Sequence, residues 1–256
     1  MVGVLSARER WLLIVPLLGG VVFGLAPFLF PVDFPRLVGY SGNDPIVSRL
    51  AGAAALGYLV ALIAGMRDGR WERLRNVILA TLVFNLVSLI ACAIEIASGR
   101  PFLIVELIVA ADIVIVLITA SLLMRHGISP QGPRDVATYV VVLLSLATLA
   151  SVVFGLAPQV PSFAAPLFGY RGTDEFVYRE AGAATLGYAV MGIWQLRSLR
   201  WAEMELPTLM AFVFNALAFI ATLLESSPLT LGVALVAPAS LVFTIATALT
   251  LVRRGR

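Results

Sequence analysis

Long apolar runs recur from one end of this chain to the other, and they limit the possible fold more than any other feature. Seven runs approach the roughly 20 residues that cross a membrane and contain no charged residue. They are residues 11–31, 50–66, 76–94, 136–158, 181–196, 206–224 and 226–252, and an eighth run, 101–124, is interrupted by Glu106 and Asp112. With 60% hydrophobic and 13% charged residues, the chain lacks the charges to cover a soluble surface. The runs predict an all-α, polytopic transmembrane bundle of eight helices.

The arginines predict the orientation of these helices. Every basic side chain apart from one histidine is an arginine, and a cytoplasmic N-terminus places 13 arginines on the inner side against five on the outer side. The five outer arginines are Arg36, Arg49, Arg100, Arg171 and Arg179, and the inner set includes Arg256. All four tryptophans fall at inner helix ends, where indole rings favour the membrane interface. We therefore expect a multi-pass protein of a bacterial-type inner membrane with both termini in the cytoplasm.

The chain also repeats itself. Residues 21–27 recur unchanged as residues 152–158, and from Gly39 onward an offset of 130 makes 25 of 57 positions identical up to Glu95. The fourth helices align more weakly, at an offset of 128. Because four spans are an even number, both copies enter the membrane in the same direction. The sequence predicts two parallel four-helix repeats, residues 1–127 and 128–256, related by a pseudo-twofold axis along the membrane normal.

One face of the second helix is kept in both copies, from Arg49 to its counterpart Arg179 onward. Small residues at Ala53 and Gly57 have the spacing that allows helices to approach closely. Tyr58 lies on the opposite face, so we expect this helix to be buried. Packing is the simpler interpretation of the conserved face.

Charged residues near the outer helix ends form the first group of candidate site residues. Arg49 begins the second helix and Glu95 ends the third at similar depth, so we expect them to pair, and Arg179 and Glu225 repeat the arrangement. Such a pair is a structural clamp between neighbouring helices. The functional alternative is an outer mouth at which arginines attract an anionic group.

Deeper polar residues form the second group. Helical rise places Tyr58 and Asn85 at a similar depth near the bilayer centre, and Tyr188 and Asn215 repeat them. A hydrogen bond within each pair would satisfy both side chains, and a polar site at the midplane is the alternative. Asp112 stands apart, because its counterpart is Ser240. A carboxylate at this depth could bind a cation, relay a proton or donate a hydrogen bond to Asn85 when protonated.

The two long outer loops share a pattern of Gly, Tyr and Asp residues, in residues 39–44 and 169–174. The pattern is typical of ordered turns. The loops either pack on the helix ends as lids or form a docking surface.

Missing residue types exclude several functions. The chain has one histidine, one cysteine and no lysine, which argues against haem held by two histidines, multi-histidine metal sites, disulfides and a retinal Schiff base. We therefore expect no cofactor, no metal site, no nucleic-acid partner and no enzymatic activity. The preferred function is a transporter-like or small-ligand- or ion-binding membrane protein with a polar site between the two repeats. The alternative is a non-catalytic scaffold subunit with a membrane-protein partner, or a homo-oligomer.

Overall fold

The computed structural model describes residues 3–99, 102–129, 133–225 and 229–254. Two of the expected spans begin at residues 101 and 226, outside the described residues, and so do Arg100 and Arg256 of the arginine count. The first half of the chain forms α1 (Ala7–Leu12), α2 (Ile14–Leu29), α3 (Asp33–Leu37), α4 (Pro45–Asp68), α5 (Trp71–Ala97) and α6 (Leu103–His126). The second half forms α7 (Thr138–Leu156), η1 (Ala157–Gln159), α8 (Pro161–Phe168), α9 (Glu175–Ser198), α10 (Trp201–Leu224) and α11 (Leu231–Arg254).

Seven segments of the described chain are long and apolar enough to cross a membrane, so the protein is an integral, multi-pass membrane protein in an all-helical fold. They are α1 with α2, α4, α5, α6, α7 with η1, α10 and α11. Helix α9 is absent from this set although, like α4, it has 24 residues. Its sequence carries Glu175, Arg179, Glu180 and Arg197, which lower its hydropathy.

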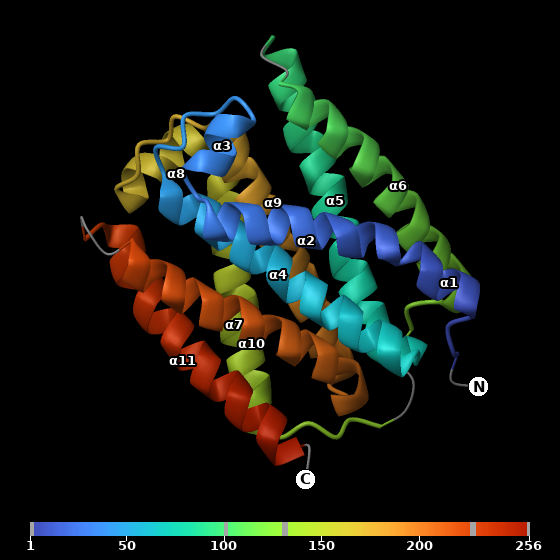
Figure 1. The fold of residues 1–256 in the computed structure, drawn as a ribbon. Helices are drawn as coiled ribbons and strands as arrows, with labels where there is room; N and C mark the ends of the chain where they lie inside the picture. The colour runs from blue at the N-terminus through green and yellow to red at the C-terminus, as the bar shows by residue number, and fades with distance from the viewer. Residues whose placement is uncertain (1–2, 100–101, 130–132, 226–228, 255–256) are drawn as a thin grey trace.

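The centre of the bundle is made by α4, α5, α9 and α10 (Figure 1). Helix α4 packs mainly against α2 and α10, and α9 packs mainly against α7 and α5. The outer helices α6 and α11 lie on α5 and α10. Consecutive helices α4 and α5 therefore contact each other less than each contacts the other half of the chain. The most apolar stretch of the central helix α4 is 72% buried, against 11% for the outer helix α11.

Local signals in the sequence set the ends of α4. Pro45 occupies the first turn, where its missing N–H costs nothing, and Gly69 ends the helix in a left-handed conformation with φ of 74°. Helix α9 ends at the equivalent position with Leu199, which adopts φ of 49°. A side chain with a Cβ is strained in this conformation.

Two tyrosines join the halves at the centre of the bundle. The Tyr58 hydroxyl donates a hydrogen bond to the Ala184 carbonyl at 2.9 Å, and the Tyr188 hydroxyl donates to the Ala54 carbonyl at 3.1 Å. Their rings meet edge to face with centroids 5.1 Å apart. These contacts fill the region between α4 and α9 with side chains.

The outer loops hold each other through two aspartates. The Asp44 carboxylate accepts hydrogen bonds from the backbone N–H groups of Arg171 and Gly172, both at 2.9 Å. In the same way the Asp174 carboxylate accepts from Ser41 and Gly42, both at 2.8 Å. Gly42 and Gly172 adopt positive φ angles of 66° and 68°, which gives both loops the same turn. We call this arrangement the reciprocal clasp.

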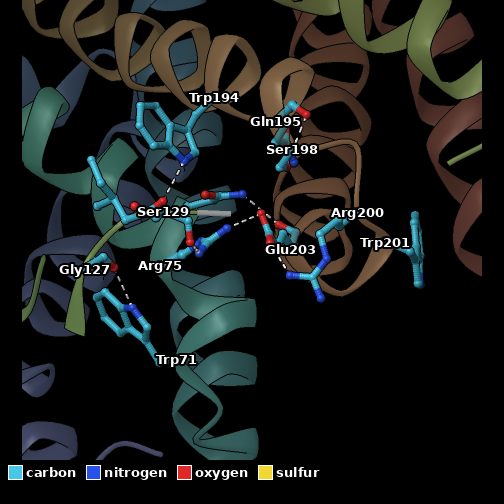
Figure 2. Close-up of polar contacts among 12 residues, drawn as sticks. Trp71, Arg75, Gly127, Ser129, Trp194, Gln195, Ser198, Arg200, Trp201 and Glu203 are labelled. Carbon is cyan, nitrogen blue, oxygen red and sulfur yellow. Dashed lines mark hydrogen bonds and ion pairs between the residues drawn. The ribbon is translucent and has the colours of Figure 1, made fainter. Parts of the chain in front are cut away.

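A charged network joins the halves where α5 and α10 begin (Figure 2), and we call it the inner network after the side on which the sequence places it. The side chain of Glu203 in α10 is fully buried, with Arg75 of α5 on one side and Arg200 at 2.6 Å on the other. Arg73 forms a second ion pair with Glu205. Each carboxylate of this network already faces an arginine.

The same network fixes the start of the segment that connects the two halves. The Trp71 indole donates to the Gly127 carbonyl at 2.9 Å, and the Trp194 indole donates to the Ile128 carbonyl at 3.2 Å (Figure 2). Arg75 donates to the Ser129 carbonyl. Both tryptophans therefore bind the backbone of this segment as well as marking an inner helix end.

Candidate functional site

An acidic cavity lies among α2, α4, α5, α6 and α9 and has a volume of about 140 Å³. Asp112 of α6, Ser88 of α5 and Glu180 of α9 line it together with mostly apolar side chains. Asp112 and Ser88 come from the first half of the chain, and Glu180 comes from the second. The cross-packing of α9 against α5 is what brings Glu180 to this place.

The three polar groups form one cluster. The Ser88 hydroxyl lies 2.9 Å from each oxygen of the Glu180 carboxylate, to which it donates. Asp112 also interacts with Ser88, and it is close enough to Glu180 for the two carboxylates to interact electrostatically. Only 6% of Asp112 is exposed, and its Oδ2 atom has no hydrogen-bond partner among the described residues. A buried carboxylate oxygen without a partner is costly, and such groups concentrate at functional sites.

No basic side chain balances these acids within the cavity. Among the described residues that line it there is no arginine and no histidine. The inner network differs in this respect, because Glu203 and Glu205 already face arginines and need no ligand. A charge from outside the protein, on a proton or a cation, can therefore complete the acidic cavity but is not needed in the inner network.

A second cavity of about 230 Å³ occupies the equivalent place in the other half, and the described residues that line it include hydroxyl and amide side chains but no charged one. We call it the uncharged cavity. Phe154, Pro158, Tyr188 and Asn215 line it, as their counterparts Phe23, Pro27, Tyr58 and Asn85 line the acidic cavity. The acids are not repeated. Glu180 corresponds to Leu50, Asp112 to Ser240 and Ser88 to Ala218, so only one of the two cavities carries carboxylates.

The structure distributes the deeper candidate residues between the two cavities. Tyr58, Asn85 and Asp112 line the acidic cavity, and Tyr188 and Asn215 line the uncharged one. The predicted hydrogen bonds from tyrosine to asparagine are wrong. Both tyrosines donate across the bundle instead, and the amide nitrogens of Asn85 and Asn215 each donate at 2.7 Å to a carbonyl in their own helix. The tyrosine and the asparagine of each predicted pair lie on consecutive helices, but their side chains bind elsewhere.

The predicted pairing of the outer charges is also wrong. Arg49 forms its ion pair with Glu225 of the other half at 2.8 Å, because α4 packs more extensively against α10 than against α5. Arg179 pairs with Glu175 at 2.5 Å, one turn earlier in α9. Glu95 accepts a hydrogen bond from Tyr40 at 3.4 Å. None of Arg49, Arg179, Glu95 and Glu225 lines either cavity.

The Tyr40 hydroxyl is suited to its role as a donor. Burial, together with the nearby Glu95 carboxylate, raises the pKa of Tyr40 above the ordinary value of a phenol. The hydroxyl therefore keeps its proton at neutral pH and donates to Glu95. This contact ties the first outer loop to the end of α5.

Reasoning from the sequence missed Glu180 and Ser88. Glu180 lies just before an apolar run, where an acidic residue is ordinary at a helix end. The signal that could have found both is the same one that marked Asp112, since each replaces an apolar or neutral residue of the other copy. Three such differences meet in one cavity.

A comparison with known protein families, with characterised proteins and with solved structures finds no match to this chain.

Proposed function

We propose that the chain is a transporter-like membrane protein that binds a small positively charged ligand in the acidic cavity. The observation that carries this proposal is Asp112, whose buried carboxylate keeps one oxygen without a partner among the described residues and faces Glu180 with no basic residue nearby. Two carboxylates in a low-dielectric surrounding repel each other, and a bound cation or proton removes this cost. In this proposal the protein binds the ligand and moves it across the membrane without changing it chemically.

The proposed scaffold is an eight-span bundle of two parallel four-helix units, residues 1–127 and 128–256, with α9 as the eighth span. Its support is the matching packing of α4 and α9. Helix α4 is covered by α2 of its own half and packs against α10 of the other, and α9 is covered by α7 of its own half and packs against α5 of the other. Both described ends of the chain lie at the end of the bundle opposite α3 and α8 (Figure 1). An even number of spans with both termini in the cytoplasm fits this arrangement.

The location of the acids favours transport over a purely structural role. Asp112 lies in the middle portion of a candidate span, and acidic residues at this depth mark ion and substrate pathways in membrane proteins. In the clasp each aspartate accepts backbone hydrogen bonds, and in the inner network each glutamate faces an arginine. The carboxylates of the acidic cavity face no basic side chain among the described residues that line it.

Flux into proteoliposomes tests the proposal. Currents are recorded on a solid-supported membrane for Na⁺, K⁺, protons and methylammonium, with the wild-type chain, with Asp112→Asn and with Glu180→Gln. We expect at least one cation to give a signal that each substitution lowers about tenfold or more, because an ion pair or charge-assisted hydrogen bond is lost.

Ser240→Ala is the matched control, since Ser240 lines the uncharged cavity at the position that corresponds to Asp112 in the acidic one. It should leave the signal unchanged. The proposal is refuted if the chain shows no cation binding and no flux that depend on Asp112 and Glu180. If such a chain co-purifies with one membrane protein, the result supports the scaffold alternative.

A further inference from the structure

We infer that the ligand of the acidic cavity is a small lipophilic amine with its ammonium group between Asp112 and Glu180 and its apolar body in the remainder of the cavity. This inference rests on the proposed function and narrows it to one class of ligand. The difference between the two cavities carries it. They share an aromatic lining, and only the acidic one carries Glu180, Ser88 and Asp112, at the positions that correspond to Leu50, Ala218 and Ser240.

The hydrogen-bonding capacity of the cluster suits an ammonium group. Such a group carries three N–H donors and no acceptor. Asp112 Oδ2 is an acceptor without a partner, and the Glu180 oxygens receive only the Ser88 hydroxyl among the described hydrogen bonds. A divalent metal ion fits less well, because calcium and magnesium require six or more oxygen ligands. The described residues contain no group of three or more histidine, cysteine or acidic side chains that could hold a metal.

The walls of the cavity suit an apolar body. Phe23, Phe84, Ile108 and Ile115 line it, and aromatic faces attract ammonium groups as well as hydrocarbon. Its volume of about 140 Å³ is close to the roughly 150 Å³ of an apolar protein cavity that holds one benzene ring. A hydrated inorganic ion would leave most of this surface unused. An amine with one ring and a short chain would fill it.

The helices on the lipid side allow such a molecule to enter from the bilayer. Helix α2 packs on α4 and makes few contacts with α6, although both line the cavity. Gly19 of α2 faces Ile115 of α6, and a methyl group added at Gly19 would still lie 3.8 Å from that side chain. At this point the wall is formed by a glycine and by a flexible isoleucine side chain that can move aside.

Equilibrium binding to the full-length chain in lipid nanodiscs tests the inference with three probes. Phenethylamine carries both the ring and the charge, 2-phenylethanol has the ring without the charge, and methylammonium has the charge without the ring. We expect phenethylamine to bind about tenfold or more tightly than either of the others, since only phenethylamine contacts both the carboxylates and the apolar walls of the cavity.

The variant Asp112→Ser with Glu180→Leu tests the charge, and the chain itself supplies the replacements. Ser240 and Leu50 occupy the equivalent positions in the other half, so the substituted cavity has a folded precedent. We expect this variant to lose about tenfold or more in phenethylamine affinity and to bind 2-phenylethanol as the wild type does. Leu50→Ala, in the uncharged cavity, is the control for a change outside the acidic cavity and should leave phenethylamine binding unaltered.

The outcomes separate this inference from the proposed function. If methylammonium or Na⁺ binds as tightly as phenethylamine and depends on Asp112 and Glu180, the cation site stands and the amine class is wrong. If phenethylamine binds equally well to the wild type and to the double variant, the carboxylates do not hold its ammonium and the inference is overturned. If no cation of any kind depends on the two acids, the proposed function fails with it. A melting temperature of the double variant at or above that of the wild type shows that folding does not explain the loss.

Discussion

At the scale of single residues, Gly57 and Gly187 allow the two halves to meet. A methyl group at Gly57 would overlap the Tyr188 hydroxyl and would lie 2.8 Å from the Met210 carbonyl, closer than such atoms approach. We expect Gly57→Ala to lower the free energy of unfolding by about 2 kcal/mol or more, as overpacking of a close contact does. Thermal unfolding in detergent measures this.

Two further variants make the Gly57 prediction specific. Gly19→Ala is the control, because the added methyl group would meet only ordinary van der Waals contact. Tyr188→Phe removes the nearer clash, leaving the ring carbon at 3.4 Å, so it should partly rescue Gly57→Ala while costing about 1 kcal/mol by itself. Equal effects of Gly57→Ala and Gly19→Ala would contradict the role of the tyrosine contact.

The repeated small residues predicted close packing of the second helix, and its burial is confirmed. The partner was not predictable, because the sequence of one helix does not specify which neighbour its face meets. The same gap explains why Arg49 was assigned to Glu95 when it contacts Glu225. The difference from the other copy marks both Asp112 and Glu180, but only the packing of α9 against α5 shows that they line the same cavity.

At the scale of elements, the reciprocal clasp makes a directional prediction. Asp44→Asn should weaken the two hydrogen bonds from residues 171 and 172 and leave those from residues 41 and 42 in place, and Asp174→Asn should do the reverse. Hydrogen exchange of these four amides measures the effect. We expect about tenfold or more faster exchange at the two affected amides, because a charge-assisted bond becomes a neutral one. Uniform loss of protection in both loops would show that the clasp opens as a unit.

A second prediction concerns the end of α9. Leu199 occupies the left-handed position that Gly69 occupies after α4. Leu199→Gly removes the strain of a Cβ in this conformation and should raise the free energy of unfolding by about 1 kcal/mol. Leu199→Ala, which keeps the Cβ, is the control and should give no such gain. A lower melting temperature for the glycine variant would show that contacts of the leucine side chain outweigh the strain.

The turn residues of the outer loops predicted ordered turns, and the described loops are ordered by the clasp. Asp44 and Asp174 stand where a helix cap would be expected, yet neither side chain caps its own helix. Each one binds the loop of the other half. A pattern within one loop carries no information about a partner 130 residues away.

At the scale of the whole molecule, the inner ion pairs distinguish the two halves. The first half supplies Arg73 and Arg75, and the second supplies Glu203 and Glu205 at the equivalent positions. The pairs are crossed, because Arg73 contacts Glu205 and Arg75 contacts Glu203. Two copies of the first half would place arginine against arginine, and two copies of the second would place glutamate against glutamate. The pairing of unlike halves is therefore favoured by charge, in addition to the cross-packing of α4 and α9.

The last prediction concerns α9, the helix whose hydropathy falls short of the other spans. If it crosses the membrane as α4 does, residues at its two ends lie on opposite sides. Cys92 is the chain's one cysteine and is buried, and Cys92→Thr adopts the residue found at position 222 of the second copy. In that background, Arg171→Cys should react with a membrane-impermeant maleimide added outside intact cells. Arg197→Cys should react only after the membrane is permeabilised.

The first half provides matched positions for this measurement. Arg36→Cys in the outer loop and Arg67→Cys at the inner end of α4 flank a helix that does meet the criterion of a span, and they should give the same contrast. Labelling of residues 171 and 197 from one side would place α9 outside the bilayer and would set the termini on opposite sides. Because Glu180 belongs to α9, that result would also remove the acidic cavity from the membrane interior. The transport proposal and the eight-span fold therefore depend on the same helix.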